Sequence, residues 1–272
     1  MQPPPPKRPP TLNYRGLQLV DLTKLLPSGF GKKFSLNGIS ADGEIFVLVT
    51  KTKFAILTKS SLICTGDIQG NRGGFGGTNS RKQSIKTVAL NDEHLFVGTE
   101  KQILIFAIRG TSAGRLVCSG DMDDGIMIDQ LILSPNGALL LALVKNGVRL
   151  QVAQIYSTSI IPSETPNAFV PTDTILWKEC KRVHSKATFS ADGNKIAIYT
   201  SHSQRQSELR FLQKSSHRWI QSRNPLLITV ISDDPDTQLG DKGITGAAMY
   251  DPNFLNPNLI SIVCTVSTWY GL

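Results

Sequence analysis

The chain lacks long apolar runs and any segment typical of membrane insertion or secretion. Its longest uninterrupted apolar stretch, Ala138–Val144, is far shorter than the roughly 18 residues that a membrane-spanning helix needs. Residues 1–10 are dominated by proline and contain no apolar core of the kind found in a secretory signal. The sequence therefore predicts no transmembrane helix and no signal peptide, and it predicts a Pro-rich disordered tail over residues 1–15.

Paired cysteines, clustered histidines and catalytic motifs are also absent. The chain contains no C-x-x-C, H-E-x-x-H, G-x-S-x-G or phosphate-loop motif, and no N-x-S/T sequon. We therefore predict no enzymatic activity, no metal and no cofactor, and we expect free thiols in a reducing cytoplasmic or nuclear location. The isolated residues are Cys64, Cys118, Cys180 and Cys264, together with His94, His184, His202 and His217.

Charge is moderate and unevenly distributed. There are 29 Lys and Arg against 21 Asp and Glu, a formal net charge of +8, and the stretch 178–223 is strongly basic. Acidic residues gather at 121–129 and 233–241. The segment 121–125 has clustered carboxylates but lacks the Gly and Glu spacing of an EF-hand loop. Solvated loops account for most such charge, so nucleic-acid binding is not the favoured interpretation.

A four-residue turn signature recurs, and a dense apolar run follows each copy. The copies are Ser40-Ala41-Asp42-Gly43, Ser134-Pro135-Asn136-Gly137 and Ser190-Ala191-Asp192-Gly193, with a degenerate version at Asn91-Asp92-Glu93. Asp-Gly and Asn-Gly favour hairpin turns, so each unit begins as an antiparallel hairpin. Recurrence of one unit along the chain is the mark of a repeat architecture.

The apolar strands after these turns predict how the repeats pack. Residues 139–144 are apolar at consecutive positions, whereas a sheet with one wet face would alternate apolar and polar residues. Such strands are covered on both faces, as in the blades of a β-propeller. We predict an all-β fold of four-stranded antiparallel meander blades in a domain over 16–272. The blades are expected at 34–68, 85–119, 128–179, 185–221 and, incomplete, 244–272.

From Phe34 onward, the Ser-x-Asp/Asn-Gly turn followed by an apolar strand and a second hairpin resembles the WD40 family. No Gly-His precedes the blades and no Trp-Asp closes a third strand, so the resemblance is to a divergent, WD40-like propeller. It implies about seven blades, while the sequence provides about five. We therefore expect a fragment of a longer propeller. In a closed ring, Gly16–Leu22 would supply a strand to the last blade.

The favoured function is a non-enzymatic scaffold that binds protein partners through its rim loops. Partner-binding candidates are Arg72 and Phe75 in the Gly-rich loop 70–77, Phe169 in an exposed loop, and Arg205 and Arg210 in the basic stretch. Trp177 and Trp219 are expected to pack between blades. One alternative is a propeller enzyme of the lactonase or hydrolase type, with carboxylates or histidines converging at the inner ends of the first strands. Another is a nucleic-acid-binding module that uses the basic fourth unit.

Overall fold

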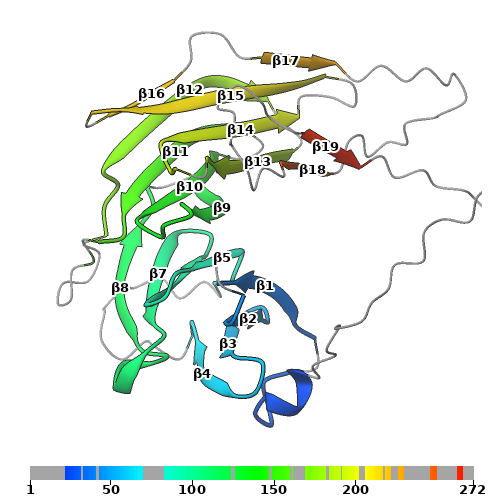
Figure 1. Cartoon of the computed structure of the whole chain (residues 1–272), viewed down its shortest axis with the longest axis vertical. Helices are drawn as coiled ribbons and strands as arrows, with labels where there is room; N and C mark the ends of the chain where they lie inside the picture. Colours follow the sequence, from blue (N-terminus) through cyan, green and yellow to red (C-terminus); the bar gives the residue numbers. More distant parts are fainter. Residues whose placement is uncertain are drawn as a thin grey trace, which may run out of the picture.

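The computed structural model of the chain consists of β-strands joined by turns, and its described residues contain two short 3-10 helices and no α-helix (Figure 1). It describes residues 22–31, 33–40, 43–69, 83–123, 126–146, 149–159, 161, 169–181, 184–190, 192–201, 206–216, 218–221, 226–229, 246–249 and 262–265. The predicted polyproline tail lies outside these residues, as do Arg72, Phe75 and Arg205.

Four antiparallel sheets, blades 1 to 4, follow one another along the chain, each with its strands side by side in chain order. Blade 1 consists of β1 (Ser35–Ile39), β2 (Phe46–Val49), β3 (Lys53–Leu57) and β4 (Leu62–Asp67). Blade 2 consists of β5 (Thr87–Leu90), β6 (His94–Gly98), β7 (Gln102–Ala107) and β8 (Leu116–Asp121). Blade 3 consists of β9 (Met127–Leu133), β10 (Leu139–Asn146), β11 (Arg149–Ser157) and β12 (Asp173–Lys181).

Blade 4 consists of β13 (His184–Phe189), β14 (Lys195–Ser201), β15 (Gln206–Ser215) and β16 (Arg218–Gln221). A further strand, β17 (Leu226–Thr229), pairs with the other half of the outer edge of β15. A two-stranded sheet of β18 (Gly246–Met249) and β19 (Ile262–Thr265) follows. The short helices are η1 (Leu22–Leu25) and η2 (Gly110–Ser112).

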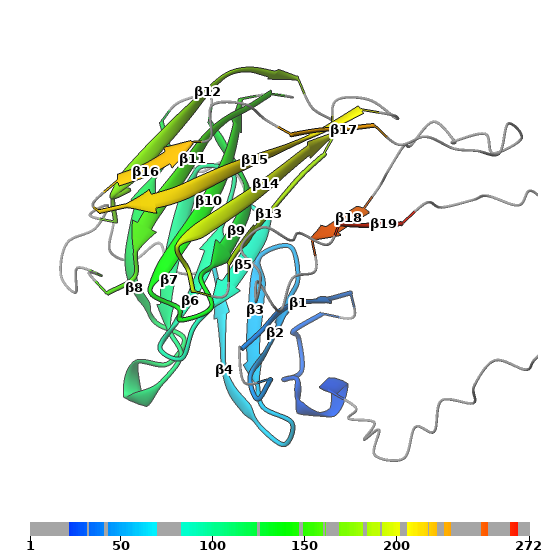
Figure 2. The same cartoon turned by 45° about the horizontal axis from the view of Figure 1, so that its top comes forward.

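The blades are arranged around their first strands. β1 contacts β5, β5 contacts β9, β9 contacts β13, and β13 contacts β18. The blades therefore fan out in chain order along an arc, with the later strands of each blade farther from its centre (Figures 1 and 2). Four-stranded meanders set side by side on their inner strands make a β-propeller. The predicted all-β fold of four-stranded antiparallel meander blades in a propeller arrangement is confirmed, with four complete blades and a two-stranded sheet after them among the described residues.

The apolar second strands are buried on both faces, as predicted. In β10, Leu140, Ala142 and Val144 pack in a cluster shared with blade 2, while Leu141 and Leu143 pack in a cluster shared with blade 4. All five side chains are fully buried. Successive side chains of a strand point to opposite faces, so a strand between two blades must be apolar at every position. This is why the sequence shows a continuous apolar run here.

The recurring turn is held together by its serine and its Asn or Asp. In blade 3 the N–H of Gly137 donates to the Ser134 carbonyl at 2.8 Å, and the N–H of Leu139 donates to Ser134 Oγ at 2.9 Å. Asn136 Oδ1 accepts from the N–H of Ala138 at 3.1 Å. The turns at Ser40 and Ser190 repeat the first two bonds. The serine hydroxyl thus replaces a backbone partner inside a buried turn.

Glycine ends each of these turns because of its backbone conformation. Gly43, Gly137 and Gly193 have φ values of 73°, 68° and 70°, in the left-handed region that favours glycine. A Cβ on Gly137 would also lie 3.1 Å from Asn91 Cβ in the preceding blade, and one on Gly193 would lie 3.8 Å from Ser134 Cβ. The turns of neighbouring blades therefore touch, and the signature serves packing between blades as well as the hairpin.

The segment before the first blade covers one face of that blade. Phe30 is buried against Leu48 and Leu57, on the face of blade 1 that points away from blade 2, with half-buried Leu25 beside it. The helical turn η1 ends shortly before Pro27. The possible closing strand Gly16–Leu22 is not described except at Leu22, which begins η1. The described part of this N-terminal segment therefore caps blade 1 itself.

The connections lie on two opposite rims. With the strands of each blade lettered A to D from inside outward, the A–B and C–D connections lie at one end of the sheets, the AB rim. The B–C connections and the links between blades lie at the other end, the BC rim, because antiparallel neighbours reverse direction. These two rims are the surfaces on which the predicted loop residues can be placed.

Candidate interaction surface

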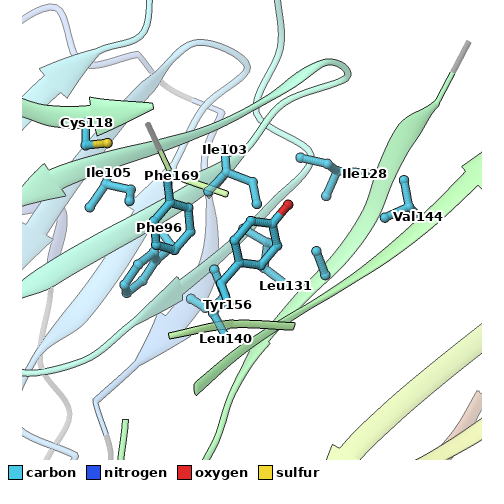
Figure 3. Close-up of a cluster of buried hydrophobic side chains, with 12 residues drawn as sticks. Phe96, Ile103, Ile105, Cys118, Ile128, Leu131, Leu140, Val144, Tyr156 and Phe169 are labelled. Atoms are coloured by element: carbon cyan, nitrogen blue, oxygen red, sulfur yellow. The ribbon is translucent and has the colours of Figure 1, made fainter. Parts of the chain in front are cut away.

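Phe169 is a core residue, and the prediction that it lies in an exposed loop is wrong. It is 4% exposed and stacks on Tyr156 with ring centroids 4.7 Å apart, while Phe96 lies 6.2 Å away on its other flank (Figure 3). Its N–H donates to the Ser119 carbonyl at 3.2 Å, on the outer strand of blade 2. Phe169 thus fastens the C–D connection of blade 3 onto blade 2, which shields that outer edge.

Arg210 is also directed inward, and it forms an ion pair with Glu208. Both lie on β15, and Arg210 is opposite Ile198, whose side chain packs toward blade 3. The side chains are only 19% and 6% exposed. Placed in this way, the guanidinium compensates a buried carboxylate rather than reaching the surface. Trp219, by contrast, packs between blades 3 and 4 as predicted, edge-on to Phe189.

Three described basic residues of the fourth unit gather on the AB rim. Lys195, Lys214 and Arg218 lie at the ends of β14, β15 and β16 on this rim. Arg210 is paired with Glu208 within blade 4. The nucleic-acid hypothesis required the charges of this unit and Arg72 to share one face. Arg72 lies outside the described residues, so the hypothesis stays a prediction.

The inner ends of the first strands hold few groups capable of catalysis among the described residues. Asp129 on β9 forms an ion pair with Lys145 at 2.8 Å, and His184 is the first residue of the neighbouring β13. Within the described part of the chain, no group of three or more His, Cys, Asp or Glu residues is placed to hold a metal ion. Partial burial lowers the pKa of His94, against the opposing charge of Glu93.

The BC rim of blades 1 and 2 carries two turns of identical construction. In blade 1 the N–H of Lys53 donates to Thr50 Oγ1 at 3.0 Å, and the N–H of Thr50 donates to the Lys53 carbonyl at 2.8 Å. In blade 2, Thr99 and Gln102 form the same pair of bonds at 3.1 and 2.9 Å. A threonine hydroxyl therefore fixes the shape of both turns.

Segments that leave and enter the blades hold these turns in place. The Thr52 carbonyl accepts from the N–H of Ile68, and the Lys101 carbonyl accepts from the N–H of Met122 at 2.7 Å. The Lys51 carbonyl accepts from the N–H of Ile85 at 2.8 Å, on the way into blade 2. Backbone groups of the two turns are thus bound to the sheets behind them, while Lys51, Glu100 and Lys101 remain exposed.

Three lysines surround one glutamate on this rim, and we call Lys51, Lys86, Glu100 and Lys101 the rim cluster. Lys86 Nζ lies 2.9 Å from Glu100 Oε1, with the side chains 43% and 48% exposed. The hydrogen bond from Lys86 is the main reason that the pKa of Glu100 is lowered, and the charges of Lys86, Lys101 and Lys51 act in the same direction. The four side chains of the cluster thus comprise three lysines and one carboxylate whose charged form they stabilise.

The charge of the exposed side chains on the BC rim changes from positive to negative next to the rim cluster. Gln102 Nε2 donates to Asp121 Oδ1 at 2.6 Å, and Gln83 Nε2 donates to Gln102 Oε1 at 3.1 Å. Asp121 and Asp123 are both exposed where the chain leaves blade 2. The BC rim therefore presents a basic patch on blades 1 and 2 with an acidic border beside it.

Sequence reasoning missed the rim cluster, although a signal for it existed. Aligning the blades on their turns places Thr50-Lys51-Thr52-Lys53 over Thr99-Glu100-Lys101-Gln102, so both turns begin with Thr and carry a Lys at the tip. Lys86 could not be found in this way, because it enters the cluster through the link between blades.

The chain is similar to several solved structures at low sequence identity. No protein-family model and no curated protein sequence matches the chain. Solved structures with a similar arrangement include Hsv2 of Kluyveromyces lactis, at 13% identity over 72% of each chain with a TM-score of 0.42. The Cps50 (Swd1) β-propeller domain of Myceliophteria thermophila is 11% identical over 67% of this chain and 52% of its own, with a TM-score of 0.42.

The periplasmic gluconolactonase PpgL of Pseudomonas aeruginosa is 13% identical over 72% of this chain and 57% of its own, with a TM-score of 0.46. The chain thus spans little more than half the length of two of these three structures. Among the residues that the structure describes, no helix has the length and hydropathy to cross a membrane.

Proposed function

We propose that the protein is a non-enzymatic interaction scaffold that binds partner proteins through the BC rim. The observation that carries this proposal is the pair of Thr-fixed turns on blades 1 and 2. Their backbones are bound to the sheets, while charged side chains at their tips are exposed. A surface that is already ordered before binding loses little conformational entropy on association, so it favours recognition.

An enzyme of the lactonase or hydrolase type would need acid, base or metal-binding groups that converge near the centre of the arc. The described groups nearest to that requirement, Asp129 and Lys145, are bonded to each other. The ordered turns of the BC rim can bind a partner without acid, base or metal-binding groups. We therefore favour the scaffold. The expected location in the cytoplasm or nucleus remains a prediction.

Site-specific photo-crosslinking in cells tests the proposal. A benzophenone amino acid at Thr52, on the BC rim, should give discrete crosslinked products with other proteins. The same probe at Ser60, an exposed residue on the AB rim of the same blade, is the matched control and should give few. Absence of discrete products at Thr52, or equal products at both positions, would show that the BC rim does not recruit proteins.

A further inference from the structure

We propose that the rim cluster binds a short acidic segment of a partner protein, whose carboxylates contact Lys51, Lys86 and Lys101. This inference rests on the proposed scaffold function and specifies the chemistry of the partner. It requires that the three lysines lie together, that a carboxylate fits between them, and that longer polyanions are disfavoured.

The three lysines are brought together by backbone bonds between blades. The Lys51 carbonyl binds the N–H of Ile85, so the first B–C turn lies against the residue before Lys86. The N–H of Lys86 donates to the Gly98 carbonyl at 2.8 Å, which places Lys86 beside the second B–C turn. The ammonium groups are therefore carried by a hydrogen-bonded framework, and their grouping does not depend on flexible connections.

Glu100 shows that a carboxylate fits among these lysines. Its Oε1 lies 2.9 Å from Lys86 Nζ, and all three ammonium groups stabilise its charged form. A carboxylate from a partner would meet the same three positive charges. Glu100 also competes with the partner, because it holds Lys86. Removing its charge should therefore strengthen binding.

The surroundings favour an acidic protein segment over a nucleic acid. Exposed Asp121 and Asp123 border the cluster, so a polyanion that continued along the rim would meet like charge. The large hydrophobic side chains that are exposed among the described residues are all aliphatic, whereas proteins that bind single strands present aromatic rings on which bases stack. They are Ile39, Val170, Leu176 and Ile220. A segment with a few neighbouring Asp or Glu residues matches the size and sign of the patch.

Fluorescence anisotropy with the whole chain and a labelled Glu-rich peptide of about a dozen residues tests the proposal, at about 50 mM salt where surface charges are weakly screened. The triple variant Lys51→Ser, Lys86→Ser, Lys101→Ser should weaken binding about tenfold, from a few-fold per exposed charge. Glu100→Gln should strengthen it about twofold to threefold. The matched control Lys195→Ser, Lys214→Ser, Arg218→Ser removes the same charge from the AB rim and should bind like the wild type. Thermal melting checks that every variant is folded.

Equal weakening in the two triple variants would overturn the proposal, because binding would then follow net charge alone. An unchanged affinity in the rim-cluster variant would overturn it too. A single-stranded oligonucleotide of similar length should bind more weakly than the peptide. Tighter binding that depends on the same lysines would replace the acidic segment with a nucleic acid. If a probe at Thr52 crosslinks to proteins but the peptide does not bind, the scaffold function is supported and the proposal of an acidic partner segment is wrong.

Discussion

Replacing Phe169 by alanine should destabilise the propeller, although this residue lies in a connection between strands. The ring is 4% exposed, stacks on Tyr156 with an interplanar angle of 10°, and faces Phe96. Truncating a buried phenylalanine to alanine costs about 3–5 kcal/mol through lost burial and the cavity left behind. Phe169 is carried by a connection that can partly close over the cavity, so we expect about 3 kcal/mol, at the low end of that range.

For a chain of this size, about 3 kcal/mol corresponds to a fall of about 6–12 °C in the melting temperature. Circular dichroism during heating measures this shift. Hydrogen exchange adds a local readout. The N–H of residue 169 is bonded to the Ser119 carbonyl, and in the variant this amide and its neighbours should exchange faster than in the wild type. Tyr156 should also become more accessible, because it loses its stacking partner.

Val170→Ala is the matched control, since this neighbour is 66% exposed and should change stability by no more than about 0.5 kcal/mol. If Phe169→Ala melts like the wild type, or like Val170→Ala, the ring does not hold the connection onto blade 2. The original expectation of an exposed partner-binding residue would then regain its basis.

Gly137→Ala should destabilise the chain by about 1–2 kcal/mol, because alanine disfavours a φ of 68° and its Cβ would lie 3.1 Å from Asn91 Cβ. Asn91→Gly in the same chain removes the contacting Cβ and leaves the φ strain at residue 137 in place, so full recovery of the melting temperature would contradict the contribution of backbone strain. Partial burial lowers the pKa of His94, so the unfolded chain binds its proton more tightly. Stability should therefore fall as the pH drops below about 6.5, and less so in His94→Gln. If the wild type and His94→Gln lose melting temperature equally as the pH falls, protonation of His94 does not cause the loss.

The strands could be predicted from the sequence because blade packing imposes a simple pattern. Leu139–Val144 is apolar throughout, and the strand that contains it is buried on both faces. The serine and glycine of each turn are required by backbone hydrogen bonds and a positive φ, both of which are local. Such constraints act within a few residues, so the order and direction of strands could be inferred before the structure.

The position of Phe169 could not be inferred, because it depends on a distant strand. A Cβ on Gly120 would lie 2.3 Å from the Phe169 carbonyl oxygen, so the absence of a side chain on β8 makes room for the connection. Neither residue signals this alone, and the polar sequence around Phe169 suggested exposure. The rim cluster has the same property in part. Lys86 and Glu100 meet through the pairing of β5 with β6 in blade 2, but Lys51 of blade 1 joins them only when the two blades pack.

The turns of the two rims differ in how far they pack on neighbouring blades, and this difference explains why partner recognition should lie on the BC rim. On the AB rim, consecutive A–B turns pack on each other, as Asn91 does on Gly137. C–D connections also cover the outer strand of the blade before, as Phe169 does at Ser119. Substitution there disturbs contacts between blades. The B–C turns at Thr50 and Thr99 close on themselves through a hydroxyl, so the residues at their tips can vary without loss of packing. A chain that must keep its blades together while it acquires a binding specificity can place that specificity on the BC rim at the least cost in stability.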